Sequence, residues 1–213
     1  MIKVIVFDFD GVLVESVDIK TKAFAHLFAH HGKNISDRVV AHHLANTGVS
    51  RFEKFKYVYD EILQSPLYDA EFQRLCREFS RLVAEEVAAA PAVPGAMEFL
   101  EATRGKYILF VASATPEQEL QEIVARRGME SYFTKVFGAP LPKREAARQS
   151  LESCACTGRE ALFVGDARSD YDAAMANGMW FVGRDSGGDV VFEGLNCQVL
   201  PDLTALEDTI VAL

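Results

Sequence analysis

The sequence predicts an α/β protein in which a doubly wound parallel sheet forms the core and an all-α segment is inserted. Short runs rich in Val, Ile and Phe, typical of buried strands, occupy residues 3–8, 107–113, 161–166 and 179–183. Helix-like segments lie between the later runs, and this alternation indicates a parallel sheet. About 95 residues separate the first two runs, far more than a connection between neighbouring strands needs. This interval must therefore contain structure of its own.

The interval has the sequence pattern of helices. Apolar side chains recur at helical spacing in three segments, residues 17–31, 51–63 and 70–90. The segment PAVPG at residues 91–95 marks a break on one side, and LVES at residues 13–16 is a candidate hinge on the other. We therefore expect an α/β core of residues 1–14 and 92–213, and a helical domain of residues 15–91.

Composition and charge limit the partners and the compartment. The chain has 213 residues, of which 49% are hydrophobic, and a net charge of −9. Such a charge argues against nucleic acid or an anionic membrane as the main partner, so any phosphate site must be local. The four cysteines show no zinc-type spacing, and no run of about 18 uncharged apolar residues occurs. We expect a cytoplasmic protein that spans no membrane.

Polar side chains follow the predicted strands. They are Asp8 and Asp10 after the first, Ser113 after the second, and Asp166 and Asp170 after the third, with Lys143 just before a helix. The carboxyl ends of parallel strands meet at one edge of a sheet, so these groups should converge there. Buried carboxylates need compensating cations. A nucleophile, oxygen ligands for a hard cation and donors for phosphate oxygens are what phosphoryl transfer to a carboxylate requires.

In this order the motifs resemble those of the haloacid dehalogenase superfamily. Its phosphotransferase members carry DxDG, then Ser or Thr, then Lys, then GDxxxD, and this chain has DFDG, VASA, Lys143 and GDARSD. The resemblance covers nearly the whole chain and implies a Rossmann-like core. The helical insert falls between the first and second motifs, where one cap type of the superfamily lies. One departure is Glu15, because many phosphatase relatives have Asp in that segment.

The resemblance implies a role for each acid. Asp8 would be the nucleophile that forms an aspartyl-phosphate, and Asp10 would be the general acid and base. The implied cofactor is Mg²⁺, with Asp8 and Asp166 as direct ligands, Asp170 as a second or water-mediated one, and Asp10 contributing its backbone carbonyl. Dehalogenase members lack the second aspartate of the first motif, so Asp10 indicates phosphoryl chemistry rather than carbon–halogen chemistry.

The second and third motifs would supply donors to the phosphoryl group. By the resemblance, Ser113 hydrogen-bonds the transferring phosphoryl group, and Ala114 of the same motif is a second candidate substrate contact. Lys143 would neutralise Asp8 and the phosphate. Relatives commonly have proline directly after this lysine, whereas Arg144 follows here, so Arg144 and Lys135 are alternative sources of the charge.

Several residues near the motifs have competing interpretations. The segment GVSR, ending at Arg51, resembles a cap segment of β-phosphoglucomutase-like members in which the arginine binds a phosphate remote from the reacting one. Arg51 is therefore a candidate substrate contact, with an exposed arginine at a helix start as the other interpretation. We expect Lys20 and Lys54 to be solvated cap cations. Thr115, before a proline, is expected to cap a helix.

These observations predict a magnesium-dependent phosphatase that acts on a small phosphorylated metabolite such as a sugar phosphate. The nearest alternative is a phosphomutase like β-phosphoglucomutase, in which the cap excludes water and the substrate accepts the phosphoryl group. A phosphonatase needs a Schiff-base lysine in the cap, in the neighbourhood that Arg51 occupies. Non-enzymatic alternatives are a phospho-accepting signalling module and a degenerate binding relative. Monomer and homodimer are equally compatible with the sequence.

Overall fold

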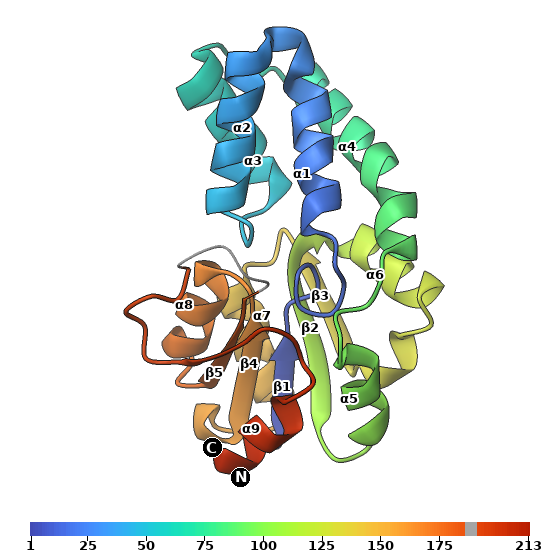
Figure 1. Ribbon diagram of the computed structural model, residues 1–213, viewed down its shortest axis with the longest axis vertical. Helices are drawn as coiled ribbons and strands as arrows, with labels where there is room; N and C mark the ends of the chain where they lie inside the picture. Colours follow the sequence, from blue (N-terminus) through green and yellow to red (C-terminus); the bar gives the residue numbers. More distant parts are fainter. Residues whose placement is uncertain (186–190) are drawn as a thin grey trace.

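A parallel β-sheet lies at the centre of the computed structural model, which describes residues 1–185 and 191–213 (Figure 1). In the described residues its strand order is β3-β2-β1-β4-β5-β6, and every neighbouring pair is parallel. The strands are β1 (Val4–Phe7), β2 (Ile108–Pro116), β3 (Lys135–Ala139), β4 (Ala161–Gly165), β5 (Trp180–Arg184) and β6 (Gln198–Leu200). The predicted α/β fold with a parallel sheet is confirmed.

The strands β3 and β6 were not predicted, and both lie at the edges of the sheet. In β3 the burial runs from exposed Lys135 to buried Ala139, and β6 has three residues, of which two are exposed. The central strands β1 and β4 are buried along their whole length. A strand that is buried on both faces gives a continuous apolar run, whereas a short edge strand gives none.

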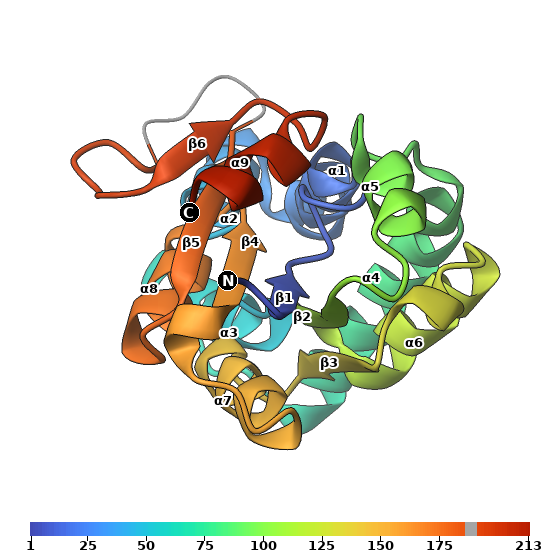
Figure 2. The same cartoon turned by 90° about the horizontal axis from the view of Figure 1, so that it is seen from below.

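Helices cover both faces of the sheet (Figure 2). One face carries α5 (Ala96–Ala102), α6 (Glu117–Arg126) and α9 (Leu206–Ala212), and the other carries α7 (Lys143–Ser153) and α8 (Arg168–Ala176). Alternate residues of β1 serve the two layers: Ile5 and Phe7 pack in the first, and Val4 and Val6 in the second. Within the described part of the chain, no helix combines the length and apolar character needed to cross a membrane.

The helices of the insert stand beyond the carboxyl ends of the strands (Figure 1). They are α1 (Val17–Phe28), α2 (Lys33–Ala45), α3 (Arg51–Tyr57) and α4 (Asp69–Ala89). A cluster of aromatic rings forms their core, with Phe24 4.8 Å from Phe79 and 5.7 Å from Phe55 between ring centroids. The helix α2 was not predicted, because it buries just Val39 and His43 and so lacks a wide apolar stripe.

The two chain segments that connect the insert to the sheet lie side by side. Val14 and Ala92 form an antiparallel bridge. The N–H of Glu15 donates to the carbonyl of Pro91 at 3.0 Å, and that of Val93 donates to Leu13 at 3.1 Å. These are the segments that the sequence marks as hinge and break. The division into a core and a cap of residues 15–91 stays a prediction, and we keep the name cap for the insert.

Glu15 lies in the first of these two connecting segments and links it to the end of β5. The guanidinium of Arg184 is 6% exposed and donates to both carboxylate oxygens of Glu15, at 2.7 and 3.1 Å. It also donates to the carbonyls of Gly11 at 3.0 Å and Pro201 at 3.1 Å. Because the cation is buried, Glu15 supplies the carboxylate that neutralises it.

We expect Glu15→Gln to lower the free energy of unfolding by about 1.5–3 kcal/mol, the range for hydrogen bonds to charged groups. The amide keeps the shape of the side chain but leaves the buried Arg184 without its carboxylate. Urea denaturation measures the change. The matched control is Glu160→Gln, whose partner Lys3 has a side chain that is 59% exposed, and which should change stability little. Equal effects of the two variants would show that the Arg184 contact is not a stabilising one.

Candidate active site

A tight turn places the first-motif aspartates at the end of β1. The N–H of Val14 donates to the carbonyl of Phe9 at 3.1 Å, and that of Gly11 donates to the carbonyl of Val14 at 2.8 Å. Gly11 has φ of +77°, and a Cβ there would lie 2.2 Å from Oδ2 of Asp166. Glycine is therefore required for both the backbone conformation and the close approach of the turn to the end of β4.

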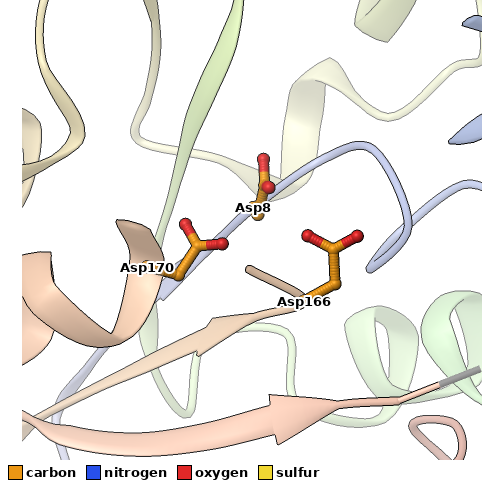
Figure 3. A group of neighbouring side chains, drawn as sticks. All are labelled: Asp8, Asp166 and Asp170. Carbon is orange, nitrogen blue, oxygen red and sulfur yellow. The ribbon is translucent and has the colours of Figure 1, made fainter. Parts of the chain in front are cut away.

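Three predicted acids converge where the strand order reverses, between β1 and β4. Asp8 follows β1, Asp166 follows β4, and Asp170 lies in the first turn of α8. One oxygen from each lies within 4.8 Å of the others, and Figure 3 shows the three carboxylates turned toward a common space. We call this group the carboxylate cluster. Ligands of doubly wound sheets bind at such reversal points, because the loops there diverge and leave a crevice.

Burial and mutual repulsion dominate the electrostatics of the carboxylate cluster. Asp8 is 3% exposed and Asp170 is fully buried. Burial, followed by the neighbouring charges of Asp8 and Asp170, raises the pKa of Asp166 well above its usual range. Burial also raises the pKa of Asp170 to about 7, although Lys143 opposes the shift. The three carboxylates are short of positive charge, and their oxygens are the hard donors that Mg²⁺ prefers, so the cluster fits this ion.

Lys143 is the cation at the carboxylate cluster. It is the first residue of α7, and its ammonium lies 2.6 Å from Asp8 Oδ2 and 2.6 Å from Asp170 Oδ1. Burial acts to lower the pKa of Lys143, but Asp170 and Asp8 outweigh it and raise the pKa above its usual value. The alternatives, Lys135 and Arg144, are both exposed. The structure thus brings Lys143, rather than its neighbours, to the predicted nucleophile.

Asp10 has different surroundings from the carboxylate cluster and is not part of it. Its carboxylate accepts hydrogen bonds from Ser16 at 2.6 Å, Thr115 at 2.9 Å and Ser113 at 3.2 Å, and lies 2.5 Å from the Lys20 ammonium. Burial acts to raise the pKa of Asp10, but Lys20 and the hydroxyls outweigh it and lower the pKa to about 2. The carboxylates of Asp8 and Asp10, two residues apart, therefore have different charged and hydrogen-bonding partners. The expected metal contact of Asp10 concerned its backbone carbonyl and stays a prediction.

Two residues beside Asp10 were misjudged from the sequence. Thr115 was predicted to cap a helix, which is wrong, because β2 continues through Pro116 and α6 begins at Glu117. Its hydroxyl donates to Asp10 and accepts from Lys20 at 2.8 Å. Lys20 was predicted to be solvated, but its side chain is 17% exposed and paired with Asp10. The sequence signal for this contact is that a buried Asp10 needs a cation, and Lys20 follows nine residues after the DFDG segment, in the first turn of α1.

A pocket lies between the carboxylate cluster and the cap. The core contributes Asp8, Asp10, Ser113, Ala114 and Asp166, and the cap contributes Lys20, Arg51 and Lys54. Its free space is about 40 Å³, comparable to the volume of a water molecule in the liquid. The predicted phosphoryl contacts Ser113 and Ala114 thus face the predicted acids, and the cap is closed over them.

Arg51 lines this pocket but already has partners. It begins α3 and is 8% exposed, so the interpretation as an exposed arginine at a helix start is wrong. Its guanidinium donates to both carboxylate oxygens of Glu119 in α6, at 3.2 and 2.8 Å, and to Ser80 in α4 at 2.9 Å. In the closed arrangement Arg51 therefore connects the cap to the core, and its contact with substrate stays a prediction.

The chain is similar to known phosphatases along most of its length. It is 26% identical over 180 residues to a phosphorylated carbohydrates phosphatase of Thermotoga maritima, covering 82% of this chain and 81% of the relative. It is 24% identical over 213 residues to a phosphoglycolate phosphatase of Pseudomonas putida, covering 96% and 78%.

Solved structures of similar fold include a phosphatase and a mutase. A predicted phosphoglycolate phosphatase from Haemophilus somnus superposes with a TM-score of 0.79 at 21% identity, covering 98% of each chain. The β-phosphoglucomutase of Clostridium difficile gives a TM-score of 0.80 at 18% identity, covering 100% of this chain and 96% of the mutase. At these identities the likeness concerns the fold. The family model for haloacid dehalogenase-like hydrolases matches residues 5–183, which confirms the resemblance seen in the motifs. The chain therefore belongs to the haloacid dehalogenase-like hydrolase family.

Proposed function

We propose that the protein is a magnesium-dependent phosphatase that hydrolyses a small phosphorylated metabolite through an aspartyl-phosphate on Asp8. The observation that carries the proposal is the contrast between two neighbouring carboxylates. Asp8 lies in the carboxylate cluster beside Lys143, whereas Asp10 lies in a separate network with Lys20. A nucleophile and a proton carrier need such different surroundings. The phosphatase names of the two curated relatives support the same activity.

In the first half of the proposed reaction, an oxygen of Asp8 attacks phosphorus and the bond to the leaving alkoxide breaks. Lys143 holds Asp8 in position, and Ser113 and Ala114 bind the phosphoryl oxygens. Asp10 gives a proton to the alkoxide. Mg²⁺ bound by the carboxylate cluster would offset the negative charge of the phosphoryl group.

In the second half, Asp10 takes a proton from water, the water oxygen attacks phosphorus, and Asp8 is released with inorganic phosphate. With a pKa of about 2, Asp10 is ionised in the closed arrangement, as a base must be, but its pairing with Lys20 and the hydroxyls makes it a weak base there. To act first as an acid it must hold a proton, which requires Lys20 to move away. Lys20 belongs to α1 and Asp10 to the loop after β1, so opening of the cap separates them.

A phosphomutase is the second candidate, and the position of Arg51 in the lining of the pocket favours it. In the mutases that the GVSR segment resembles, this arginine binds a phosphate remote from the reacting one. The mutase would use the same residues but pass the phosphoryl group from Asp8 to a second hydroxyl of the substrate.

Both reactions fit a cytoplasmic protein, the location that we propose because all four cysteines are free thiols.

We expect Asp8→Asn to abolish phosphate release and Asp10→Asn to slow it by about 10²- to 10⁴-fold, the usual contribution of a general acid–base group. An amide in place of the Asp8 carboxylate is a poor nucleophile, and an amide in place of the Asp10 carboxyl group has no acidic proton to give to the alkoxide. Phosphate release from a panel of phosphorylated metabolites, with Mg²⁺, measures both. Asp172→Asn is the control, because this carboxylate is exposed and pairs with Arg168 on the surface of α8.

Each outcome of this assay has a definite meaning. Phosphate release by Asp8→Asn at the wild-type rate would contradict the proposed mechanism. If the wild type releases no phosphate but isomerises a sugar phosphate after priming with a bisphosphate, the mutase replaces the phosphatase. A stable phosphorylated Asp8 without turnover would identify a phospho-accepting module.

The charge of the carboxylate cluster predicts a pH-dependent stability that Mg²⁺ reverses. The pKa of Asp170 is about 7 in the folded protein and about 3.9 when unfolded. The folded state therefore holds this proton more tightly, and raising the pH from about 4 to 7 removes the stability that Asp170 contributes to the wild type. Asp170→Asn has no such proton, so in chelator its stability relative to the wild type should rise over this window.

Urea denaturation at several pH values, with chelator and with Mg²⁺, measures this difference. Mg²⁺ binds the ionised carboxylates of the folded state, so it should stabilise the wild type at pH 7 and stabilise Asp170→Asn less. Asp172→Asn should follow the wild type in both conditions. A difference that does not change with pH, or equal stabilisation of Asp170→Asn and the wild type by Mg²⁺, would contradict the assignment of the cluster as the metal site.

A further inference from the structure

The cap lines the pocket with three cations, of which two have carboxylate partners. Lys20 pairs with Asp10, and Arg51 pairs with Glu119. Lys54, the third, is 2% exposed and forms no ion pair with a carboxylate in residues 1–185 or 191–213. Its ammonium donates to Nδ1 of His43 at 2.8 Å and lies 3.5 Å from the carbonyl of Thr47. A buried positive charge without an anion is costly.

His43 adds a second donor beside Lys54. Its ring is 3% exposed and stacks on Phe24, with centroids 4.6 Å apart and planes inclined by 29°. Because Nδ1 accepts from the ammonium, the hydrogen of the neutral ring lies on Nε2. Burial, with Lys54 next, lowers the pKa of His43 to about 3 and so keeps the ring neutral. Nε2 is buried and has no hydrogen-bond partner among the described residues.

The surroundings of Lys54 hold too little negative charge to offset its burial and the nearby cations. Burial, then the ammonium groups of Lys20 and Lys143, lowers the pKa of Lys54 to about 7, although Asp10 and Asp166 oppose the shift. An anion placed beside Lys54 would counteract both effects on its pKa, because it pairs with the charge and offsets the other two cations. The pocket that Lys54 lines also holds the predicted nucleophile Asp8. An anion bound beside Lys54 would therefore share the pocket with a phosphate presented to Asp8.

We propose that Lys54 and His43 form a binding site for a second anionic group of the substrate, so that the substrate is a short phosphate monoester with an additional carboxylate or phosphate. This inference rests on the proposed phosphatase function and names its substrate class. Lys54 takes the specificity role that the sequence assigned to Arg51. Both terminal nitrogens of Arg51 are already engaged by Glu119 and Ser80. Because Lys54 and Asp8 line the same pocket, the two anionic groups lie close together in a short substrate, which enters when the cap opens.

The first test compares substrates that differ in one charge. Phosphoglycolate carries a carboxylate, ethylene glycol bisphosphate carries a second phosphate, and 2-hydroxyethyl phosphate carries a neutral hydroxyl on a two-carbon chain. We expect the wild type with Mg²⁺ to prefer one or both acidic substrates. Lys54→Met removes the charge and keeps the length of the side chain. It should reduce the ratio of kcat/KM for the acidic over the neutral substrate by about 10- to 100-fold, mainly through KM.

Two further variants accompany Lys54→Met: one is a control for loss of a lysine charge, and the other tests His43. Lys56→Met removes an exposed cation two residues away on α3 and should keep the wild-type ratio. His43→Phe retains a ring against Phe24 but removes both nitrogens, and should reduce the ratio in the same direction as Lys54→Met. If the wild type shows no preference for an acidic substrate, or if Lys54→Met lowers kcat/KM equally for all three, the proposal is overturned.

A binding measurement tests the subsite without catalysis. Glycolate and, separately, inorganic phosphate are titrated into the Mg²⁺-loaded wild type and Lys54→Met, and the thermal midpoint of unfolding is followed. Glycolate should raise the midpoint of the wild type and not that of Lys54→Met, whichever reaction the enzyme catalyses. Equal shifts in both proteins would overturn the subsite, whereas absent phosphate release with a Lys54-dependent glycolate shift would overturn only the proposed function. Borohydride trapping of Lys54 with phosphonoacetaldehyde would instead make Lys54 a nucleophile and overturn the proposal.

Discussion

The structure around the site depends on the compensation of buried negative charge. Three carboxylates lie within 4.8 Å of one another, and the Lys143 ammonium contacts two of them, Asp8 and Asp170. One cation cannot neutralise three acids, which is why burial and repulsion raise the pKa of Asp166 so far. The same imbalance that costs stability in the protein alone creates a site for a divalent cation and for a reaction that transfers an anionic group.

The parallel sheet makes this concentration of charge possible. Because β1 and β4 are neighbours and parallel, with Phe7 beside Val164, the residues that follow them emerge at the same edge. Glycines allow the close approach: a Cβ at Gly165 would lie 2.2 Å from the Cβ of Asp170. The buried apolar strands β1 and β4 fix the positions of Asp8 and Asp166, which follow them directly. The site is therefore positioned by regular structure, and the loops add only the turn that contains Gly11.

The cap covers the site from the side opposite the sheet. Cations of the cap form ion pairs with carboxylates of the core. Lys20 reaches Asp10, and Arg51 reaches Glu119 across the interface. These contacts satisfy core acids while the cap is closed, so a substrate must compete with them or use what is left unpaired. Lys54 has no carboxylate partner among residues 1–185 and 191–213, and at 2% exposure it is more buried than Arg51 and Lys20, which pair with the core. Closure and substrate recognition thus depend on different cations of the same domain.

The sequence by itself determined the fold class, the helical insert and the order of the four motifs, because buried strands and strand-end acids leave a local pattern. It identified Asp8, Asp166, Asp170 and Lys143, which the structure brings together. It did not identify the edge strands, whose apolar runs are too short, or α2, whose buried face has too few apolar residues.

Only the tertiary structure decided the roles of the cations. Lys20, Arg51 and Lys54 look alike along the chain, but one meets Asp10, one meets Glu119 and one meets His43. These partners lie 10, 68 and 11 positions away in the sequence. Whether a charge is paired depends on contacts that form when the cap packs against the sheet and its helices pack together, and no local pattern records them.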